Sequence, residues 1–133
     1  MAQDIKKIIA QEYLKCAKDP AYFMRKYCYI QHPTRGRILF NLYPFQDKIL
    51  HLFKDNQYNI VLKSRQLGIS TLSAAYSLWL MIFHKDKNVL ALATTQATAR
   101  NLVTKVIFMY DQLPKWLRLP SVEKNKLSLR LKN

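Results

Sequence analysis

The spacing of apolar residues predicts helices in several parts of the chain. Over 4–17, isoleucines and a leucine recur at three- and four-residue intervals among lysines and glutamines, which is typical of an amphipathic helix. The Asp-Pro pair at 19–20 ends that helix, and its proline suits the first position of a second helix over 21–29. Another proline opens a predicted helix over 45–55, whose apolar residues fall on one face.

Two short apolar runs indicate buried strands of the kind found in parallel sheets. Residues 58–62 and 88–93 are rich in aliphatic side chains and are bounded by polar residues. Between them, residues 70–84 form a predicted helix that is apolar nearly all round and therefore buried. Residues 97–113 form a clearer amphipathic helix, which Pro114 ends. The order strand, helix, strand, helix is the pattern of an α/β domain.

Two weaker strand signals lie outside this pattern. One is 37–41, within an otherwise irregular stretch over 30–45, and the other is 126–131, where leucines alternate with polar residues. Because a parallel sheet usually has more than two strands and helices on both faces, we expect the 133 residues to be the front part of a larger fold. The longest apolar stretch, 72–83, is shorter than the roughly 20 residues that span a bilayer. The first residues lack the apolar segment of a signal peptide.

The charge of the chain points to its partners. It has 22 Lys and Arg residues against 8 Asp and Glu residues, a net charge of +14. Such an excess is common in chains that meet phosphate, in nucleic acid or acidic lipid, and the alternative is a solvated basic surface. The two cysteines suit neither a zinc template nor a disulfide framework, which favours buried, reduced thiols. The three histidines lie too far apart in the sequence to suggest a metal cluster.

The stretch between the first predicted strand and its helix carries the candidate chemistry. Residues 63–71, Lys-Ser-Arg-Gln-Leu-Gly-Ile-Ser-Thr, have the strand–loop–helix context of the phosphate-binding pattern G-x-x-x-x-G-K-[ST]. Gly68 stands where the second glycine belongs, and Ser70 stands where the magnesium-binding hydroxyl belongs. Lys63 replaces the first glycine and Ile69 replaces the lysine. Backbone N–H groups at a helix start hold phosphate whatever the side chains are, so the pattern predicts a nucleotide site.

Two cations of this stretch, and two hydroxyl residues at its end, are candidates for specific roles. Lys63 can reach the β- and γ-phosphates from the start of the loop, and the Arg65 guanidinium can hold two phosphate oxygens at once. In the competing interpretation, Ser70 and Thr71 are only helix caps.

With its lysine at the start of the loop, 63–71 resembles the deviant Walker A loop of large terminase subunits, the DNA-packaging motors of tailed bacteriophages. Three upstream segments resemble the same family: Asp19-Pro20-Ala21-Tyr22-Phe23, Ile30-Gln31-His32-Pro33 and Leu42-Tyr43-Pro44-Phe45-Gln46. The resemblance implies a P-loop NTPase-like parallel sheet with flanking helices, incomplete in this chain. It also implies an N-terminal helical, lid-like segment over 1–42, followed over 43–133 by the Walker A half of the ATPase domain.

The resemblance also implies roles for individual residues. Lys63 and Arg65 become catalytic cations, the latter resembling an arginine finger that stabilises charge, and Ser70 becomes a magnesium ligand. An aromatic–glutamine pair contacts adenine in this family, which implies Phe45 and Gln46, with Tyr43 beside them. Otherwise the two aromatic residues belong to the core and the glutamine to the surface. The implied ATP-binding loop residues are Lys63, Ser64, Arg65, Gln66, Leu67, Gly68, Ile69, Ser70 and Thr71.

The implied cofactors are ATP and Mg²⁺. The implied partners are double-stranded DNA, the portal protein, the small terminase subunit and further copies in a homo-oligomeric ring, with no membrane. The implied location is the host cell cytoplasm and, transiently, the procapsid portal. The C-terminal third is very basic and either faces DNA or is solvated, through Lys85, Lys87, Lys105, Lys115, Arg118, Lys124, Lys126, Arg130 and Lys132.

Hydrolysis of ATP also needs acidic residues that hold magnesium and position water. The apolar run that ends at 106–111 is not such a Walker B motif, because Gln112 follows its aspartate and the segment fits a helix better than a strand. We therefore expect this motif and the nuclease domain to lie beyond Asn133. We also expect hydrolysis of ATP by the chain alone to be absent or very weak. Two other interpretations stay open, a basic DNA-binding module without enzymatic activity and a fragment of a helicase-like ATPase.

Overall fold

A computed structural model describes residues 1–132, which form five helices and two small antiparallel sheets, so the expected mixed α/β class is confirmed. The predicted parallel sheet is not present among these residues. In chain order the elements are α1 (Ala2–Lys18), α2 (Pro20–Tyr27), β1 (Tyr29–His32), β2 (Gly36–Leu39), α3 (Pro44–Asp55), α4 (Ile69–Phe83), α5 (Gln96–Asp111), β3 (Ser121–Lys124) and β4 (Leu129–Leu131).

All five helices lie where the apolar spacing and the prolines predict them. Helix α2 begins at Pro20, and the Asp19 side chain accepts a hydrogen bond of 2.9 Å from the N–H of Ala21. It ends two residues earlier than expected, because Tyr29 enters strand β1. Thr95 caps α5 by accepting from the N–H of Thr98 at 3.2 Å. Among the helices formed by residues 1–132, none combines the length and apolar content needed to cross a membrane.

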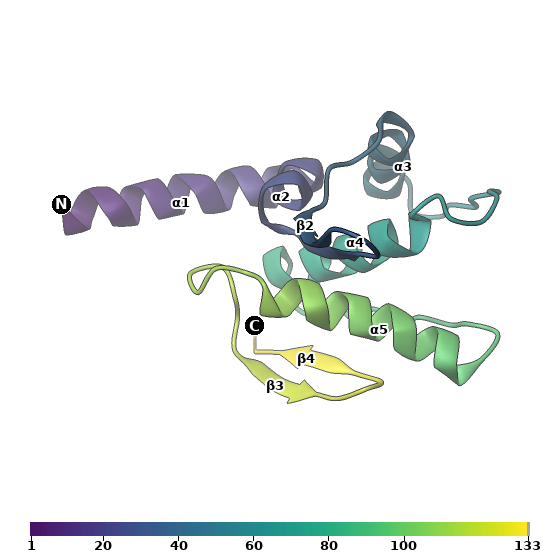
Figure 1. Ribbon diagram of the computed structural model, residues 1–133. Coiled ribbons are helices and arrows are strands. Elements are labelled where there is room, and N and C mark those ends of the chain that lie inside the picture. Colours follow the sequence, from purple (N-terminus) through teal and green to yellow (C-terminus); the bar gives the residue numbers. More distant parts are fainter. Residues whose placement is uncertain (133) are drawn as a thin grey trace.

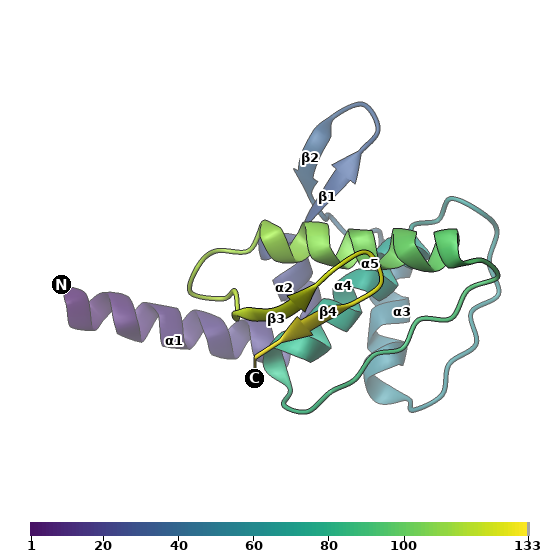
Figure 2. The same cartoon turned by 90° about the horizontal axis from the view of Figure 1, so that it is seen from below.

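The strand predicted over 37–41 is found as β2, and it pairs with β1 in an antiparallel hairpin. Figure 2 shows this hairpin standing out from the body beside α5. The pairing places Tyr29 opposite Leu39 and His32 opposite Gly36, whose positive φ of 69° helps close the turn. At the base, the N–H of Phe40 donates to the carbonyl of Cys28 at 2.8 Å. The sequence missed β1, because its polar and apolar residues do not alternate along a regular strand.

The two strands predicted over 58–62 and 88–93 are wrong for this structure. Both segments are extended loops (Figure 2), and their large side chains are exposed, with Ile60, Leu62 and Leu90 almost or fully open to solvent. A strand forms only where a neighbouring strand takes up its backbone hydrogen bonds, and no strand of residues 1–132 is paired with either segment. The signal over 126–131 is confirmed in part as β4, which pairs with β3.

One core is shared by residues on both sides of the predicted boundary at 42/43. Helices α4 and α5 run side by side (Figure 1), and α2 packs on α4. The side chains buried in this core include Phe23, Met24, Leu42, Leu72, Leu78, Met109 and Leu117. Helix α1 extends away from the body in Figure 1, and the indole N–H of Trp79 holds its end by donating to the carbonyl of Cys16 at 2.8 Å. The boundary itself stays a prediction.

A carboxylate joins the first two helices. Glu12 Oε1 of α1 accepts hydrogen bonds from three groups of α2: Lys26 Nζ at 2.6 Å, Tyr22 at 2.7 Å and Tyr27 at 2.8 Å. The bond from Lys26 and then those from the two tyrosines lower the pKa of Glu12 to about 2.

The expectation of buried, reduced thiols is confirmed. Cys16 and Cys28 are both free and fully buried. Burial raises the pKa of the Cys16 thiol to about 12 and also raises the pKa of Cys28.

Candidate phosphate-binding site

The loop before α4 has a backbone shape that suits an anion. Gln66 and Gly68 both have left-handed backbone, with φ of 62° and 72°. Gly68 is the N-cap of α4, and no side chain of the described residues caps this helix. The N–H groups of its first turn, at 69–71, lie ahead of the first intrahelical bond, which runs from the N–H of Leu72 to the carbonyl of Gly68 at 2.9 Å. These N–H groups and the helix dipole favour a bound anion.

The alternative interpretation of Ser70 and Thr71 as helix caps is wrong. Helix α4 begins at Ile69, so these two residues occupy its second and third positions and Gly68 occupies the cap. The Ser70 side chain is exposed and lines a cavity of about 300 Å³ between the start of α4, residues 91–93 and the first turns of α5. Lys105 of α5 lines the same cavity. The hydroxyl is therefore open to a ligand at the start of the helix.

The two cations of the loop are exposed and carry no acidic partner. Lys63 Nζ donates to the carbonyl of Ser64 at 3.3 Å, a weak contact that a phosphate can replace. Within residues 1–132, neither Lys63 nor Arg65 forms an ion pair with a carboxylate. The positive charge around the loop is therefore not neutralised by the described part of the chain.

Gln46 connects this loop to helix α3. Its side-chain oxygen accepts from the N–H of Tyr43 at 2.9 Å, and its Nε2 donates to the carbonyl of Leu67 at 3.0 Å. The residue is buried, so the alternative of a surface glutamine is wrong. One N–H and one lone pair of the carboxamide are engaged inside the chain, and the predicted contact with adenine would use the others. That contact stays a prediction.

The same side chain explains why position 68 is a glycine. A Cβ atom at Gly68 would lie 2.6 Å from Gln46 Nε2, closer than side-chain atoms pack. Sequence reasoning missed this role of Gln46 in supporting the loop. A signal was present, because Gln46 is the third residue of a helix opened by Pro44, the position from which a glutamine bonds back to the cap.

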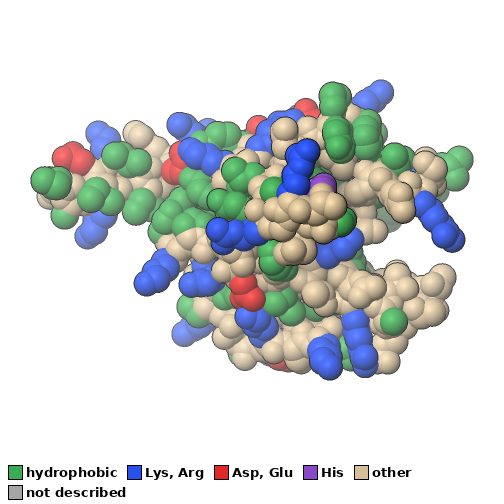
Figure 3. Space-filling view, in the orientation of Figure 1, with side chains coloured by type: hydrophobic (Ala, Val, Ile, Leu, Met, Phe, Trp, Pro, Cys, Tyr) green, Lys and Arg blue, Asp and Glu red, His purple; other side chains and the backbone are tan. Residues whose placement is uncertain are grey.

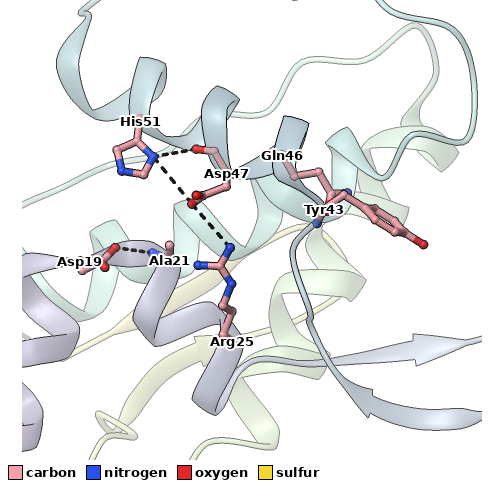
Figure 4. A network of polar contacts seen from close by, with 7 residues as sticks. All are labelled: Asp19, Ala21, Arg25, Tyr43, Gln46, Asp47 and His51. Atoms are coloured by element: carbon pink, nitrogen blue, oxygen red, sulfur yellow. Dashed lines mark hydrogen bonds and ion pairs between the residues drawn. The ribbon is translucent and has the colours of Figure 1, made fainter.

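Tyr43 and Phe45 form an exposed aromatic pair next to Gln46. Their rings are stacked with centroids 5.8 Å apart and planes 8° from parallel. The side chains are 64% and 40% exposed, so the alternative that both belong only to the core is wrong. In Figure 4 the Tyr43 ring points away from the polar cluster of α2 and α3. Flat, exposed rings of this kind can stack on a nucleobase.

A polar cluster fixes α3 against α2 (Figure 4). Asp47 Oδ1 lies 3.8 Å from Arg25 Nη2 and 3.7 Å from His51 Nδ1, which also donates to the backbone carbonyl of Asp47 at 2.7 Å. This cluster uses the acidic residue that follows Gln46 in the sequence to hold the two helices together. Helix α3 is thereby held to α2 through Asp47 and to the loop through Gln46.

The rejection of 106–111 as a Walker B strand is confirmed, because these residues belong to helix α5 and Asp111 Oδ1 accepts from Lys124 Nζ at 2.6 Å. Among residues 1–132, no group of three or more His, Cys, Asp or Glu side chains is arranged to hold a metal ion. The role of Ser70 as a magnesium ligand stays a prediction. The chain matches no protein-family model. Interpretation of the loop therefore depends on its sequence and its geometry.

Proposed function

We propose that this chain binds ATP with Mg²⁺ through the loop at 63–71, as the Walker A part of the ATPase domain of a large terminase subunit. In this proposal the complete protein acts in the host cytoplasm and at the procapsid portal. There it packages double-stranded DNA as a homo-oligomeric ring, together with the portal protein and the small terminase subunit. The observation that carries the proposal is the uncapped start of α4, preceded in the chain by Lys63 and Arg65, two cations without acidic partners in residues 1–132.

The phosphates, the adenine and the magnesium ion each have a matching group in the chain. The first-turn N–H groups and the two cations suit the β- and γ-phosphates, and the stacked rings of Tyr43 and Phe45 suit the adenine. Mg²⁺ prefers oxygen ligands and binds largely through phosphates and water, so the exposed Ser70 hydroxyl would suit it as a protein ligand. The ion would neutralise phosphate charge when bound.

We also propose that 58–62 and 88–93 are neighbouring strands of a P-loop parallel sheet in the complete protein. Each segment is extended, apolar and exposed, and each leads directly towards the start of a helix, α4 and α5 respectively. This is the order of a βαβα unit, in which further strands would take up the open backbone groups.

Calorimetric titration with Mg-ATP tests the nucleotide site. We expect Lys63→Ala to weaken binding by about 10-fold or more, since a hydrogen bond to a charged group contributes about 1.5–3 kcal/mol. The matched control is Lys7→Ala on α1, which also removes one exposed lysine and should leave the affinity unchanged. Equal affinities of the two variants would overturn the proposal.

A second candidate function is a basic DNA-binding module without a nucleotide site, which the net charge of +14 favours. The two functions differ in one measurement. A module of this kind would bind duplex DNA with a steep salt dependence and show no affinity for Mg-ATP.

A further inference from the structure

The β1–β2 hairpin is a two-stranded ribbon that projects from the body, with its base packed on α2 and α5 (Figure 2). Four residues in each strand give it a length of about 10–13 Å, at roughly 3.4 Å per residue. The major groove of B-form DNA is about 8.5 Å deep and 12 Å wide, and it admits a ribbon of this kind. The hairpin therefore has the dimensions of a groove-reading element.

The register separates the ribbon into an inner and an outer face. Ile30 and Ile38 are paired and half-buried, and Ile30 packs against the core. Gln31 and Arg37 are paired on the opposite face, and both are exposed. Arg35 is exposed at the turn. Arginine pairs with guanine and with phosphate, and glutamine pairs with adenine, so this face carries side chains that recognise duplex DNA.

Two sets of contacts within the chain order the face that carries Gln31 and Arg37. The Arg37 guanidinium lies over the Tyr29 ring, 4.7 Å from its centroid, and donates to the side-chain oxygen of Gln112 at the end of α5. Arginine has five N–H donors, so most of them stay available for a second partner. At the turn, His32 Nδ1 accepts from the N–H groups of Thr34 and Arg35, both at 3.2 Å. Both arginines are thus carried on an ordered backbone.

The local charge favours a polyanion. No Asp or Glu occurs between Asp19 and Asp47, a stretch that contains the whole hairpin. Figure 3 views the molecule as Figure 1 does, with β2 near the centre, and shows many Lys and Arg side chains and few acidic ones on this face. The turn residues, Pro33, Thr34 and Arg35, include no large apolar side chain of the sort that enters a lipid surface. The aromatic ring of the ribbon, Tyr29, lies under Arg37 instead of offering a face to an unpaired base.

From these observations we propose that the β1–β2 hairpin binds in the major groove of duplex DNA, with Arg35 and Arg37 as its main contacts. Duplex DNA is also the partner in the proposed function, and this proposal adds the surface of the chain that contacts it. It needs no nucleotide at the loop over 63–71, so each proposal can fail without the other.

The test is fluorescence anisotropy with a labelled DNA duplex of about 20 base pairs and the 133-residue chain, over a series of salt concentrations without nucleotide. Each phosphate contact adds about 0.9 to the slope of log affinity against log salt. We expect the double variant Arg35→Ala/Arg37→Ala to lower that slope by about 1.8 and to weaken binding about 60-fold at 0.1 M salt. The control Lys6→Ala/Lys7→Ala removes the same charge from α1 and should change the affinity less than about threefold.

The single variant Arg35→Ala tests the proposal without disturbing the fold. Within residues 1–132 the Arg35 side chain makes no hydrogen bond or ion pair, so its removal should leave the fold intact and still weaken binding about eightfold. Equal weakening by the arginine and the lysine double variants would overturn the proposal, because binding would then follow net charge alone.

Two further probes separate the partner classes. Single-stranded DNA of the same length should bind without dependence on the two arginines, and so should vesicles of phosphatidylserine and phosphatidylcholine. If either of these probes loses affinity in the arginine variant as strongly as the duplex does, the groove-binding proposal is wrong. Arg35→Ala should keep the Mg-ATP affinity of the wild type in the calorimetric titration, which distinguishes failure at the hairpin from failure at the loop.

Discussion

Position 68 offers a direct measurement of how Gln46 supports the phosphate-binding loop. The perturbation is Gly68→Ala, and Gly36→Ala serves as its matched control. Both glycines have left-handed backbone, with φ of 72° and 69°. A Cβ at Gly36 would meet nothing within 4 Å, whereas one at Gly68 would lie 2.6 Å from Gln46 Nε2. The two variants therefore share the backbone strain and differ in the contact with glutamine.

The structure sets the size of the difference. An L-residue in left-handed backbone lowers the free energy of unfolding by about 1–2 kcal/mol, and this loss is common to both variants. In Gly68→Ala, Gln46 must also retreat by most of an ångström to reach the 3.4 Å of an ordinary contact. That movement breaks its hydrogen bond of 3.0 Å to the Leu67 carbonyl and leaves a buried amide unpaired, which costs about 1–3 kcal/mol more. The double variant with Gln46→Ala should cost less than the sum of its two single changes, because the clash is then absent.

Urea unfolding followed by tryptophan fluorescence measures these free energies, since Trp79 is buried in the core. We expect Gly68→Ala to lower the free energy of unfolding by about 1–3 kcal/mol more than Gly36→Ala. Equal losses in the two glycine variants, together with additivity of Gly68→Ala and Gln46→Ala, would refute the contact between glutamine and loop.

Three further predictions concern the packing of the first helices. Glu12→Gln should lower the stability at pH 7 by about 1 kcal/mol, and the deficit should shrink as pH falls from 4.5 towards 2. The reason is that the carboxylate of the wild type, whose pKa is lowered, loses its stabilising charge in that range, as unfolding at several pH values would detect. Trp79→Phe should destabilise the chain by about 1–3 kcal/mol in thermal unfolding, because the buried Cys16 carbonyl then loses its donor. Neither Cys16 nor Cys28 should react with a thiol reagent until urea unfolds the chain, and modification of the native state would contradict their burial.

The position of the candidate site along the chain could be predicted from the sequence, but the arrangement of its side chains could not. The order of Lys63, Gly68 and Ser70 identifies the loop and the start of its helix. The sequence did not predict that Tyr43 and Phe45 are exposed and that Gln46 is buried. Both facts depend on how α3 packs next to the loop, where Gln46 bonds to a residue 21 positions further along the chain. Single-sequence patterns carry no information on such a contact.

The helices could be predicted from the sequence alone, since their hydrogen bonds join residues four apart and their ends are marked by Pro20, Pro44 and Pro114. Features that need a distant partner depend on how the chain folds. The apolar runs at 58–62 and 88–93 have strand composition and still form no strand, because strand hydrogen bonds require a paired neighbour and no strand of residues 1–132 pairs with either run. Tyr29–His32, for which the sequence predicted no strand, forms β1 because β2 folds back against it.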